Sequence, residues 1–424
     1  MGKAIFHTLQ TKQALISSLK VVQEATVAKK ALLLWGQQEL SWEHAMQTYM
    51  WMVRRAPSLF GTVRYHIPVH GGLYDHHHPA FGQTFRRSEI KYSLLAILHE
   101  AQGLQFSDPR DRIFAFAALA QDLETHVSVQ PDYNAPFLHV YKQFAINYVR
   151  STGDTDLLDY VGQNEETLQS EAPSWVPRWD SRVTTLAPER SSHRPPLKPK
   201  SLVACEPIFI ESSILKVRGV VMDEVVWTSD TLREADMTLD SIFHIWEVVC
   251  DSEVVDSPYP TTNMVLAFLI VLATGMFGGE LSTWKRSEAA CAVRLLERTS
   301  YVGGRELTRW RREAGGGDVN SFITFVKVRS CDSKFILTRR GYMGLAPHVT
   351  EERDSCAIIF GCTSSCILRT TDRESQYQFL GSSYIAGKQA LKAKGGGVGF
   401  RQLGHELSKD WVDWDLEEQD IELR

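Results

Sequence analysis

Apolar side chains recur at helical spacing in three stretches of the first 180 residues. The first stripe comprises Ile90, Leu94, Leu95, Ile97 and Leu98, and Gly103 ends the helix that it predicts. The third comprises Phe137, Val140, Tyr141, Phe144 and Tyr148. Between them, residues 113–120 are apolar on almost every side, as in a buried helix. The pattern therefore predicts a mainly helical N-terminal half.

The buried helix predicted over residues 113–120 follows directly on a charged segment, Asp108-Pro109-Arg110-Asp111-Arg112. Asp108 is a good N-cap, because its carboxylate can accept the free backbone N–H groups of a first turn. Pro109 suits the next position, where its missing donor costs nothing. Asp111, three residues after the cap, resembles the acid of a capping box, and both acids suit the positive end of the helix dipole. We interpret the segment as the start of a helix, with a catalytic carboxylate pair as the alternative.

A proline- and tryptophan-rich segment, APSWVPRWD, covers residues 172–180. A proline pushes the residue before it towards extended conformations, so Pro177 and its neighbours predict a rigid connector. Trp175 and Trp179 are expected to pack as its anchors. Residues 181–200 are rich in Pro, Ser and basic residues, which is typical of a linker.

After residue 200 the chain alternates between strand and helix patterns. Residues 213–227 are rich in β-branched side chains and predict strands, whereas residues 229–325 predict helices with glycine-rich breaks. From Lys334 the apolar period becomes two, in short runs separated by turn residues. Gly341, followed by Tyr342, predicts a tight turn, Gly361 a hairpin, and Gly387 the end of the last strand. The fold class is therefore α+β, with a C-terminal antiparallel β unit that has inserted helices.

Composition adds a few limits to this fold. The net charge is -5 and the pI near 6.3, which does not indicate nucleic-acid binding by the chain as a whole. The apolar run Met264–Phe277 is too short to span a bilayer. Because the N-terminus lacks the pattern of a secretory leader, we expect a cytoplasmic protein with seven reduced cysteines. The acidic tail after residue 410 is expected to dock as a helix.

Several short motifs resemble chemical sites, but each has a simpler interpretation. Gly381–Gln389 has five residues between its glycines where a phosphate-binding loop has four, so a structural turn is preferred. His76–His78 predicts a solvated loop rather than a metal site. The thiols of Cys362 and Cys366 have no second pair at zinc-site spacing and are expected to be ordinary. We therefore predict no metal and no cofactor.

Seven patterns occur in a characteristic order. Val21–Trp42 contains Gln23 and Glu24 in VVQE, then a short apolar strand, a glycine turn and a Ser-Trp helix start. SDPRDRIFAFAALA, VQPDYNAPFLHVYKQFA and APSWVPRW follow in the N-terminal half. KFILTRRGYMGLAP, IIFGCTSSCILR and YQFLGSSYIAGK follow in the β region. Together they resemble the fungal heterokaryon-incompatibility (HET) domain proteins over residues 21–388.

The resemblance also implies what is missing. The family carries an early Ser-Tyr-x-Trp-Gly and a later Trp-x-Asp-x-x-Cys-Ile-Asn-Gln in its TIR-like α/β domain, and neither occurs here. Residues 1–45 are therefore expected to be the remnant of the end of that domain, either because the coding sequence starts upstream or because the protein is a truncated member. A helical region (46–180), a linker (181–200), a mixed region ending in the β unit (201–395) and an acidic tail (396–424) would follow.

The resemblance implies a role in nonself recognition and programmed cell death, exerted through protein–protein contact, with another incompatibility factor as a conceivable partner. Exposed aromatic residues near the linker and tail would serve as anchors. Because some TIR-like domains cleave NAD with a glutamate, the alternative is an NAD-cleaving enzyme using Glu24, or an enzyme of a secondary-metabolite cluster. A structural role is preferred for Glu24, since one glutamate cannot form a pocket. A nucleic-acid binder using Arg190–Lys200 is the third, least favoured hypothesis.

Overall fold

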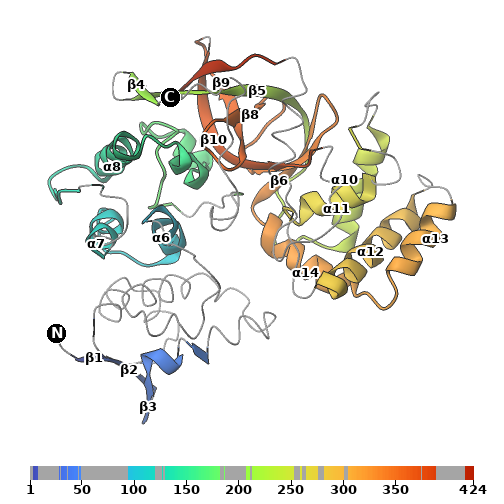
Figure 1. Cartoon of the computed structure of the whole chain (residues 1–424), viewed down its shortest axis with the longest axis horizontal. Coiled ribbons are helices and arrows are strands. Elements are labelled where there is room, and N and C mark those ends of the chain that lie inside the picture. The colour runs from blue at the N-terminus through green and yellow to red at the C-terminus, as the bar shows by residue number, and fades with distance from the viewer. Residues whose placement is uncertain are drawn as a thin grey trace. The chain divides into compact units, whose positions relative to one another are not determined.

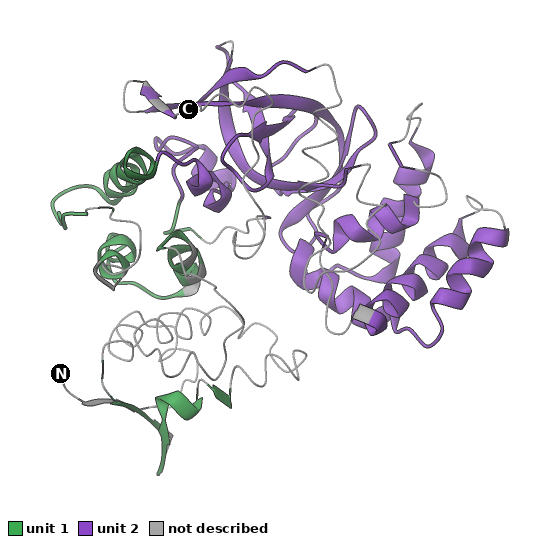
Figure 2. Ribbon diagram, viewed as in Figure 1, with its two compact units in different colours: residues 1–152, 178–182 green, residues 153–177, 183–424 purple. Residues whose placement is uncertain are grey.

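The structure is a computed structural model. It describes residues 3–7, 28, 30–35, 37–45, 47–48, 94–119, 127, 129–181, 186, 207–210, 213–252, 258–259, 264–275, 281–299, 304–373, 375–387 and 416–424. The chain divides into two compact units (Figure 2). Unit 1 comprises Met1–Thr152 and Arg178–Arg182, and unit 2 comprises Gly153–Pro177 and Val183–Arg424.

Unit 1 begins with a small three-stranded sheet. Strand β1 (Lys3–His7) pairs in parallel with β2 (Lys30–Trp35), which pairs antiparallel with β3 (Gln38–Ser41). Residues 42–45 are helical, and the Ser41 hydroxyl accepts a hydrogen bond from the His44 backbone N–H (3.1 Å), so the predicted Ser-Trp helix start is confirmed. The expectation of a mainly helical N-terminal half is not supported, because this sheet precedes the helices and residues 49–93 lie outside the described residues.

Three apolar stripes of the sequence form the helical part of unit 1. Helix α6 (Leu94–Glu100) continues into the 3-10 helix η2 (Ala101–Gly103), and α7 (Asp111–Leu119) and α8 (Phe137–Thr152) follow. Their predicted inward faces are buried, since they contain Leu94, Leu95, Ile97, Leu98, Ile113, Phe116, Val140, Tyr141, Phe144 and Tyr148. Helical periodicity was therefore a sufficient signal for these elements.

Unit 2 is built on an antiparallel sheet whose strand pairings close into a ring (Figure 1). Its strands are β4 (Ile208–Ile210), β5 (Ile214–Thr228), β6 (Ser333–Thr338), β7 (Met343–Pro347), β8 (Ser355–Ile359), β9 (Ser365–Thr370), β10 (Gln376–Ile385) and β11 (Gln419–Leu423). The ring runs β5-β6-β7-β10-β9-β8 and returns to β5, while β4 pairs with β5. The predicted antiparallel β unit is confirmed.

The long strand β5 closes this ring because it is irregular in two places. Its pairing shifts register between Val221 and Asp223, opposite β8, and again between Val225 and Trp227, opposite β6. Such irregularities bend a strand and increase its twist. One strand can therefore pair with β8 along its middle and with β6 along its end.

The last described residues correct the expectation of a docked helix. Residues 419–423 form strand β11, which pairs antiparallel with β5 and in parallel with β10. Ile421 and Leu423 are fully buried, and they alternate with Asp420 and Glu422, which is the period of a strand. Asp420 forms ion pairs with basic side chains of β5, the closer being that of Lys216 (2.6 Å).

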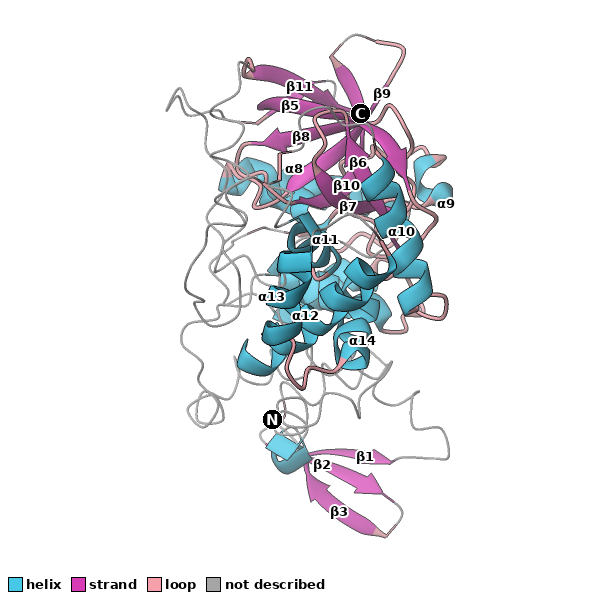
Figure 3. Cartoon of the chain, turned by 90° about the vertical axis from the view of Figure 1, so that its right-hand side faces the viewer, coloured by secondary structure: helices cyan, strands magenta, loops and turns pink. Residues whose placement is uncertain are grey.

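Helices α10–α14 lie between β5 and β6 in the sequence and extend from the strands of unit 2 (Figure 3). Their bounds are Leu239–Asp251, Met264–Leu272, Leu281–Arg298, Gly304–Glu313 and Val319–Ser330. Two short elements, η3 (Asp156–Tyr160) and α9 (Glu165–Leu168), precede the ring. In the part of the chain that the structure describes, no helix is both long and apolar enough to span a bilayer.

Helix α11 joins the inserted helices to the strands. The ring of Phe268 lies 5.3 Å from the ring of Trp246 on α10 and 5.2 Å from that of Phe335 on β6. All three side chains are fully buried. The helices and the strands of unit 2 therefore share one hydrophobic core, and the apolar run at Met264 is core rather than a membrane segment.

Candidate functional site

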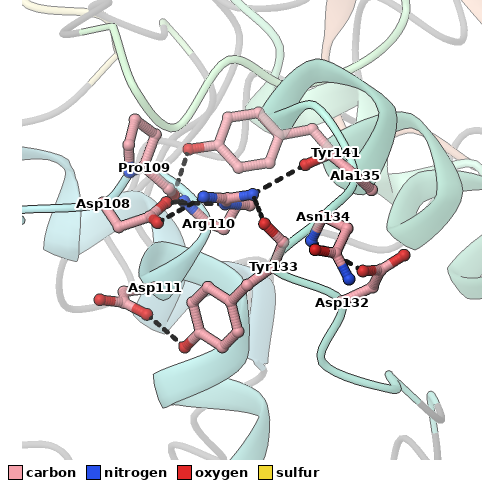
Figure 4. A network of polar contacts seen from close by, with 9 residues as sticks. All are labelled: Asp108, Pro109, Arg110, Asp111, Asp132, Tyr133, Asn134, Ala135 and Tyr141. Carbon is pink, nitrogen blue, oxygen red and sulfur yellow. Dashed lines mark hydrogen bonds and ion pairs between the residues drawn. The ribbon is translucent and has the colours of Figure 1, made fainter.

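Two clusters of polar side chains bring together residues that are distant in the sequence. The first, in unit 1, is shown in Figure 4 and is called the Arg110 network; it comprises Asp108, Pro109, Arg110, Asp111, Tyr133, Ala135 and Tyr141. The second, in unit 2, is called the Asp159 cluster; it comprises Thr155, Asp159, Gly361, Cys362 and Thr363.

Asp108 starts the turn that leads into α7. Its Oδ1 atom accepts the backbone N–H of Arg110 (2.9 Å), which is how an acid stabilises the start of a helix. The same carboxylate accepts two hydrogen bonds from the Arg110 guanidinium, from Nε (2.9 Å) and from Nη2 (2.7 Å). The backbone N–H of Asp111, the first residue of α7, is bonded to the Asp108 carbonyl (3.1 Å). Asp108 therefore caps the turn and also orients an arginine.

Arg110 uses its remaining donors on a loop that follows later in the chain. Its Nη1 atom donates to the backbone carbonyls of Tyr133 and Ala135, the latter at 2.9 Å (Figure 4). Its guanidinium also lies 5.4 Å from the centre of the Tyr133 ring. A planar guanidinium can bind several acceptors at once, which a lysine ammonium does less well. Arg110 thus clamps the loop before α8 to the start of α7.

Two tyrosine hydroxyls complete the network. Tyr133 donates to Asp111 Oδ1 (2.7 Å), and Tyr141 of α8 donates to the carbonyl of Pro109 (2.7 Å). The Tyr133 ring packs edge-on against Phe114 of α7, with the ring centres 5.2 Å apart. The partner of the Asp111 carboxylate is therefore a tyrosine from another segment, in place of the reciprocal capping contact that the sequence suggested.

Arg112 closes the end of the preceding helix. Its guanidinium donates to the carbonyls of Ala101 (3.2 Å), Gln102 (3.2 Å) and Leu104 (3.0 Å), and lies 4.2 Å from the centre of the Phe106 ring. The last carbonyls of a helix lack partners within the helix, and a cation there also suits the helix dipole. Arg112 therefore caps the C-terminal end of the segment formed by α6 and η2, and Asp108 caps the turn that leads into α7.

The electrostatics of the Arg110 network hold each group in its ordinary charge state. Hydrogen bonds from Arg110 lower the pKa of Asp108, and the hydrogen bond to Asp108 raises the pKa of Arg110. The hydrogen bond to Asp111 raises the pKa of Tyr133. General acid–base catalysis at neutral pH requires a group whose pKa lies near 7. These shifts move away from 7, so the network is suited to fixing geometry rather than to transferring protons.

The tryptophans of the APSWVPRWD segment are both fully buried, as predicted for anchors. In unit 1, the Trp179 ring packs edge-on against Tyr141 (5.6 Å between centres) and Phe144 (5.3 Å). In unit 2, the Trp175 indole donates to the carbonyl of Ser213 (3.0 Å). Pro177 is the last residue of this stretch to belong to unit 2. Neither tryptophan is exposed, so neither can anchor a protein partner.

Asp159 is a buried acid that we did not single out in the sequence. It lies on η3, and its Oδ2 atom accepts the backbone N–H of Thr363 (2.9 Å) and its hydroxyl (2.8 Å). Burial raises the pKa of Asp159 to about 7. The available signal was the acid itself, placed between Leu158 and Tyr160 in an apolar run. An acid there must find buried donors, and the β8–β9 turn supplies them.

The rest of the Asp159 cluster binds η3 to the same turn. The Thr155 hydroxyl donates to the carbonyl of Phe360 (2.8 Å), and the Cys362 thiol donates to the carbonyl of Thr155 (3.4 Å). Gly361 has a φ of 98°, and an added Cβ would overlap the Thr155 hydroxyl. Burial raises the pKa of the thiols of Cys362 and Cys366, and neither forms a disulfide. Both are therefore buried thiols, and the expectation that they are ordinary stays a prediction.

The other predicted site residues do not converge on one place. Gly341 has a φ of 81° and forms the β6–β7 turn, where its N–H is bonded to the Thr338 carbonyl (2.8 Å). The backbone N–H of Tyr342 is bonded to the Thr338 hydroxyl (3.0 Å), and Gly387 is buried just beyond β10. The structural turn preferred for Gly381–Gln389 is wrong for its first residues, because residues 381–385 belong to strand β10; residues 388–389 lie outside the described residues.

Some candidates lie outside the described residues, namely Gln23, Glu24 and His76–His78. Within the described ranges, no group of three or more His, Cys, Asp or Glu side chains is placed to hold a metal ion. No profile of a known protein family, no curated protein and no solved structure matches the chain. The family resemblance therefore depends on the sequence patterns and on how the structure joins them.

Proposed function

We propose that this chain is a heterokaryon-incompatibility-type protein that takes part in nonself recognition and the regulation of programmed cell death in a filamentous fungus. It would act in the cytoplasm through contact with another protein. The observation that carries this proposal is the Arg110 network, because it joins three of the patterns on which the family resemblance depends.

The three patterns are separate in the sequence but contact one another in unit 1. Arg110 of SDPRD bonds the carbonyls of Tyr133 and Ala135 in the PDYNAP pattern. Tyr141, which belongs to the same VQPDYNAPFLHVYKQFA pattern, donates to the carbonyl of Pro109 and packs on Trp179 of the SWVPRW pattern. Residues that fit together in space have a physical reason to occur together in a family. These contacts support the resemblance by giving the three patterns one structural role.

The C-terminal patterns behave in the same way within unit 2. KFILTRRGYMGLAP forms β6, β7 and their turn, IIFGCTSSCILR joins β8 to β9, and YQFLGSSYIAGK contains most of β10. All of these strands are neighbours in the closed ring. If the members of the family share this sheet, they would also share the three patterns that form its strands. The C-terminal patterns therefore support the same family as the N-terminal patterns.

Action by contact is favoured by what the polar clusters do. The charged groups of the Arg110 network bond to one another and to backbone carbonyls, and the Asp159 carboxylate bonds to a turn. A catalytic group must reach a substrate and change its charge during the reaction. The pKa shifts of the Arg110 network move away from 7, and Asp159, whose pKa is about 7, is buried against the β8–β9 turn and cannot reach a substrate. Both clusters are therefore better explained as supports for the fold.

The proposal can be tested by inducible expression of the chain in a filamentous fungus. We expect growth arrest and uptake of a vital dye in a strain that contains an incompatible partner, and normal growth in its absence. The variant Arg110→Met should lose the effect together with its folding stability, whereas Arg110→Lys should retain part of both. Cell death that follows NAD loss, with NAD converted by the purified chain, would establish the enzymatic alternative instead.

A further inference from the structure

Basic side chains are concentrated in helices α12–α14 of unit 2. The chain as a whole has 46 basic and 51 acidic residues. Residues 281–330 instead contain ten basic side chains, namely Lys285, Arg286, Arg294, Arg298, Arg305, Arg309, Arg311, Arg312, Lys327 and Arg329. Their acidic residues are Glu288, Glu297, Glu306, Glu313 and Asp318. This segment is therefore positive in a protein that is otherwise negative.

Helix α13 presents part of this charge as a stripe. Arg305, Arg309 and Arg312 are four and three residues apart, so they share one face of the helix. The face extends for about 10 Å, at 1.5 Å per residue. On the other side, Trp310 is buried and Leu307 packs against the core of unit 2. Helix α13 therefore packs against the core of unit 2 through its apolar side, and its arginines lie on the other side.

The acids of the helix neutralise only part of the stripe. Glu306 and Glu313 both approach Arg309, at 3.6 Å and 3.7 Å. Among the described residues, no ion pair is found for Arg305 or Arg312, and both are exposed. Like charges this close on a helix repel one another. An anionic ligand would relieve that repulsion.

The surroundings favour a protein ligand over nucleic acid or membrane. Single-stranded nucleic acid binds by stacking on exposed aromatic rings, but Trp284, Trp310 and Phe322 in these helices are buried. A helix that binds membranes inserts an apolar face, whereas the apolar face of α13 is in the core. A long polyanion would also meet the negative charge of the rest of the chain.

We propose that the α13 face formed by Arg305, Arg309 and Arg312 binds an acidic segment of a partner protein. The guanidinium groups of Arg305 and Arg312 would each take a carboxylate of that segment in a two-pronged hydrogen bond, while Arg309 stays paired with Glu306 and Glu313. The proposal is independent of a role in cell death, because its test measures binding alone.

The test uses the full chain and a fluorescent peptide of about 12 residues, rich in Asp and Glu, with anisotropy as the readout. We expect saturable binding that weakens as salt rises from about 50 mM to about 300 mM. The double variant Arg305→Glu with Arg312→Glu should lose about tenfold or more in affinity. A matched double variant, Arg233→Glu with Arg373→Glu, changes two exposed arginines elsewhere in unit 2 and should bind within about twofold of the native chain.

Three outcomes would overturn the proposal. They are no binding by the native chain at low salt, equal loss in the two double variants, and equal binding of a peptide with Asn and Gln in place of the acids. Tighter binding of a DNA or RNA oligonucleotide by the same face would replace it with nucleic-acid recognition. The substitutions Arg305→Lys with Arg312→Lys keep the charge but not the planar fork, so they should restore only part of the affinity. Circular dichroism of every variant separates lost binding from lost folding.

Discussion

Replacing Arg110 by methionine removes the side chain that connects the start of α7 to the loop before α8. The variant loses the hydrogen bonds to the carbonyls of Tyr133 and Ala135 and the paired bonds to Asp108. Hydrogen bonds that involve a charged group contribute about 1.5–3 kcal/mol, and exposed ion pairs about 0–1 kcal/mol. Because the side chains of Arg110 and Asp108 are only 22% and 27% exposed, we expect a loss of about 2–3 kcal/mol in the free energy of unfolding of unit 1.

Arg110→Lys separates the charge from the geometry. It retains the positive charge but cannot bond Asp108 and two carbonyls at the same time, so we expect a loss of about 1–2 kcal/mol. The assay is urea unfolding combined with hydrogen exchange of the first turns of α7 and α8, which reports on unit 1. As a control, Lys142→Met on α8 also removes one positive charge. It should alter the free energy of unfolding by less than about 0.5 kcal/mol.

A double-mutant cycle with Asp108→Asn measures the contribution of the ion pair itself. We expect a coupling energy of about 1 kcal/mol, because both side chains retain some contact with solvent. The reasoning would be refuted if Arg110→Met left unfolding and hydrogen exchange unchanged. Lost biological activity in such a stable variant would show that Arg110 contacts a ligand or partner directly.

The remaining predictions concern unit 2. Since burial raises the pKa of Asp159 to about 7, the folded state keeps a proton between about pH 4 and pH 7 that the unfolded chain releases. Unit 2 should therefore lose stability as pH rises through this range, and Asp159→Asn should flatten that slope in thermal unfolding. Gly361→Ala should destabilise unit 2 by about 2 kcal/mol or more, whereas Gly153→Ala, also at positive φ but with open space around it, should cost about 1 kcal/mol; chemical denaturation compares the two. In the native protein a maleimide should label the half-buried Cys331 before the buried Cys362, as mass spectrometry can show, and equal labelling would contradict the burial of the Asp159 cluster.

Periodicity identified the elements whose partners lie close in sequence. The stripes of α6, α7 and α8 are long enough to define a helical face. The strands from β6 to β10 are short, mostly buried runs separated by turn residues. Gly341 identified its turn because a positive φ strongly favours glycine. In each case the signal is local, because hydrogen bonds between near neighbours decide the structure.

Long-range pairing is the part that the sequence did not reveal. Strand β11 was expected to be a helix because its acidic, tryptophan-containing surroundings obscured a period of two over only five residues. Its place is decided by β5 and β10, strands that lie far from one another in sequence. Arg110 is a similar case. Its role in the helix start is local, but its acceptors at Tyr133 and Ala135 lie 23 and 25 residues away.

Asp108 and Asp159 show why residue type alone does not predict a site. Asp108 lies beside an arginine that lowers its pKa, so it stays ionised and its contribution to stability is lost only as pH falls below about 4. Asp159 meets hydroxyl and amide donors, and burial raises its pKa to about 7. Asp159 is therefore most compatible with folding when it is protonated, and Asp108 when it is charged. The same side chain stabilises unit 1 at neutral pH and destabilises unit 2 there. The difference lies in the burial of Asp159 and in the Arg110 guanidinium that bonds to Asp108.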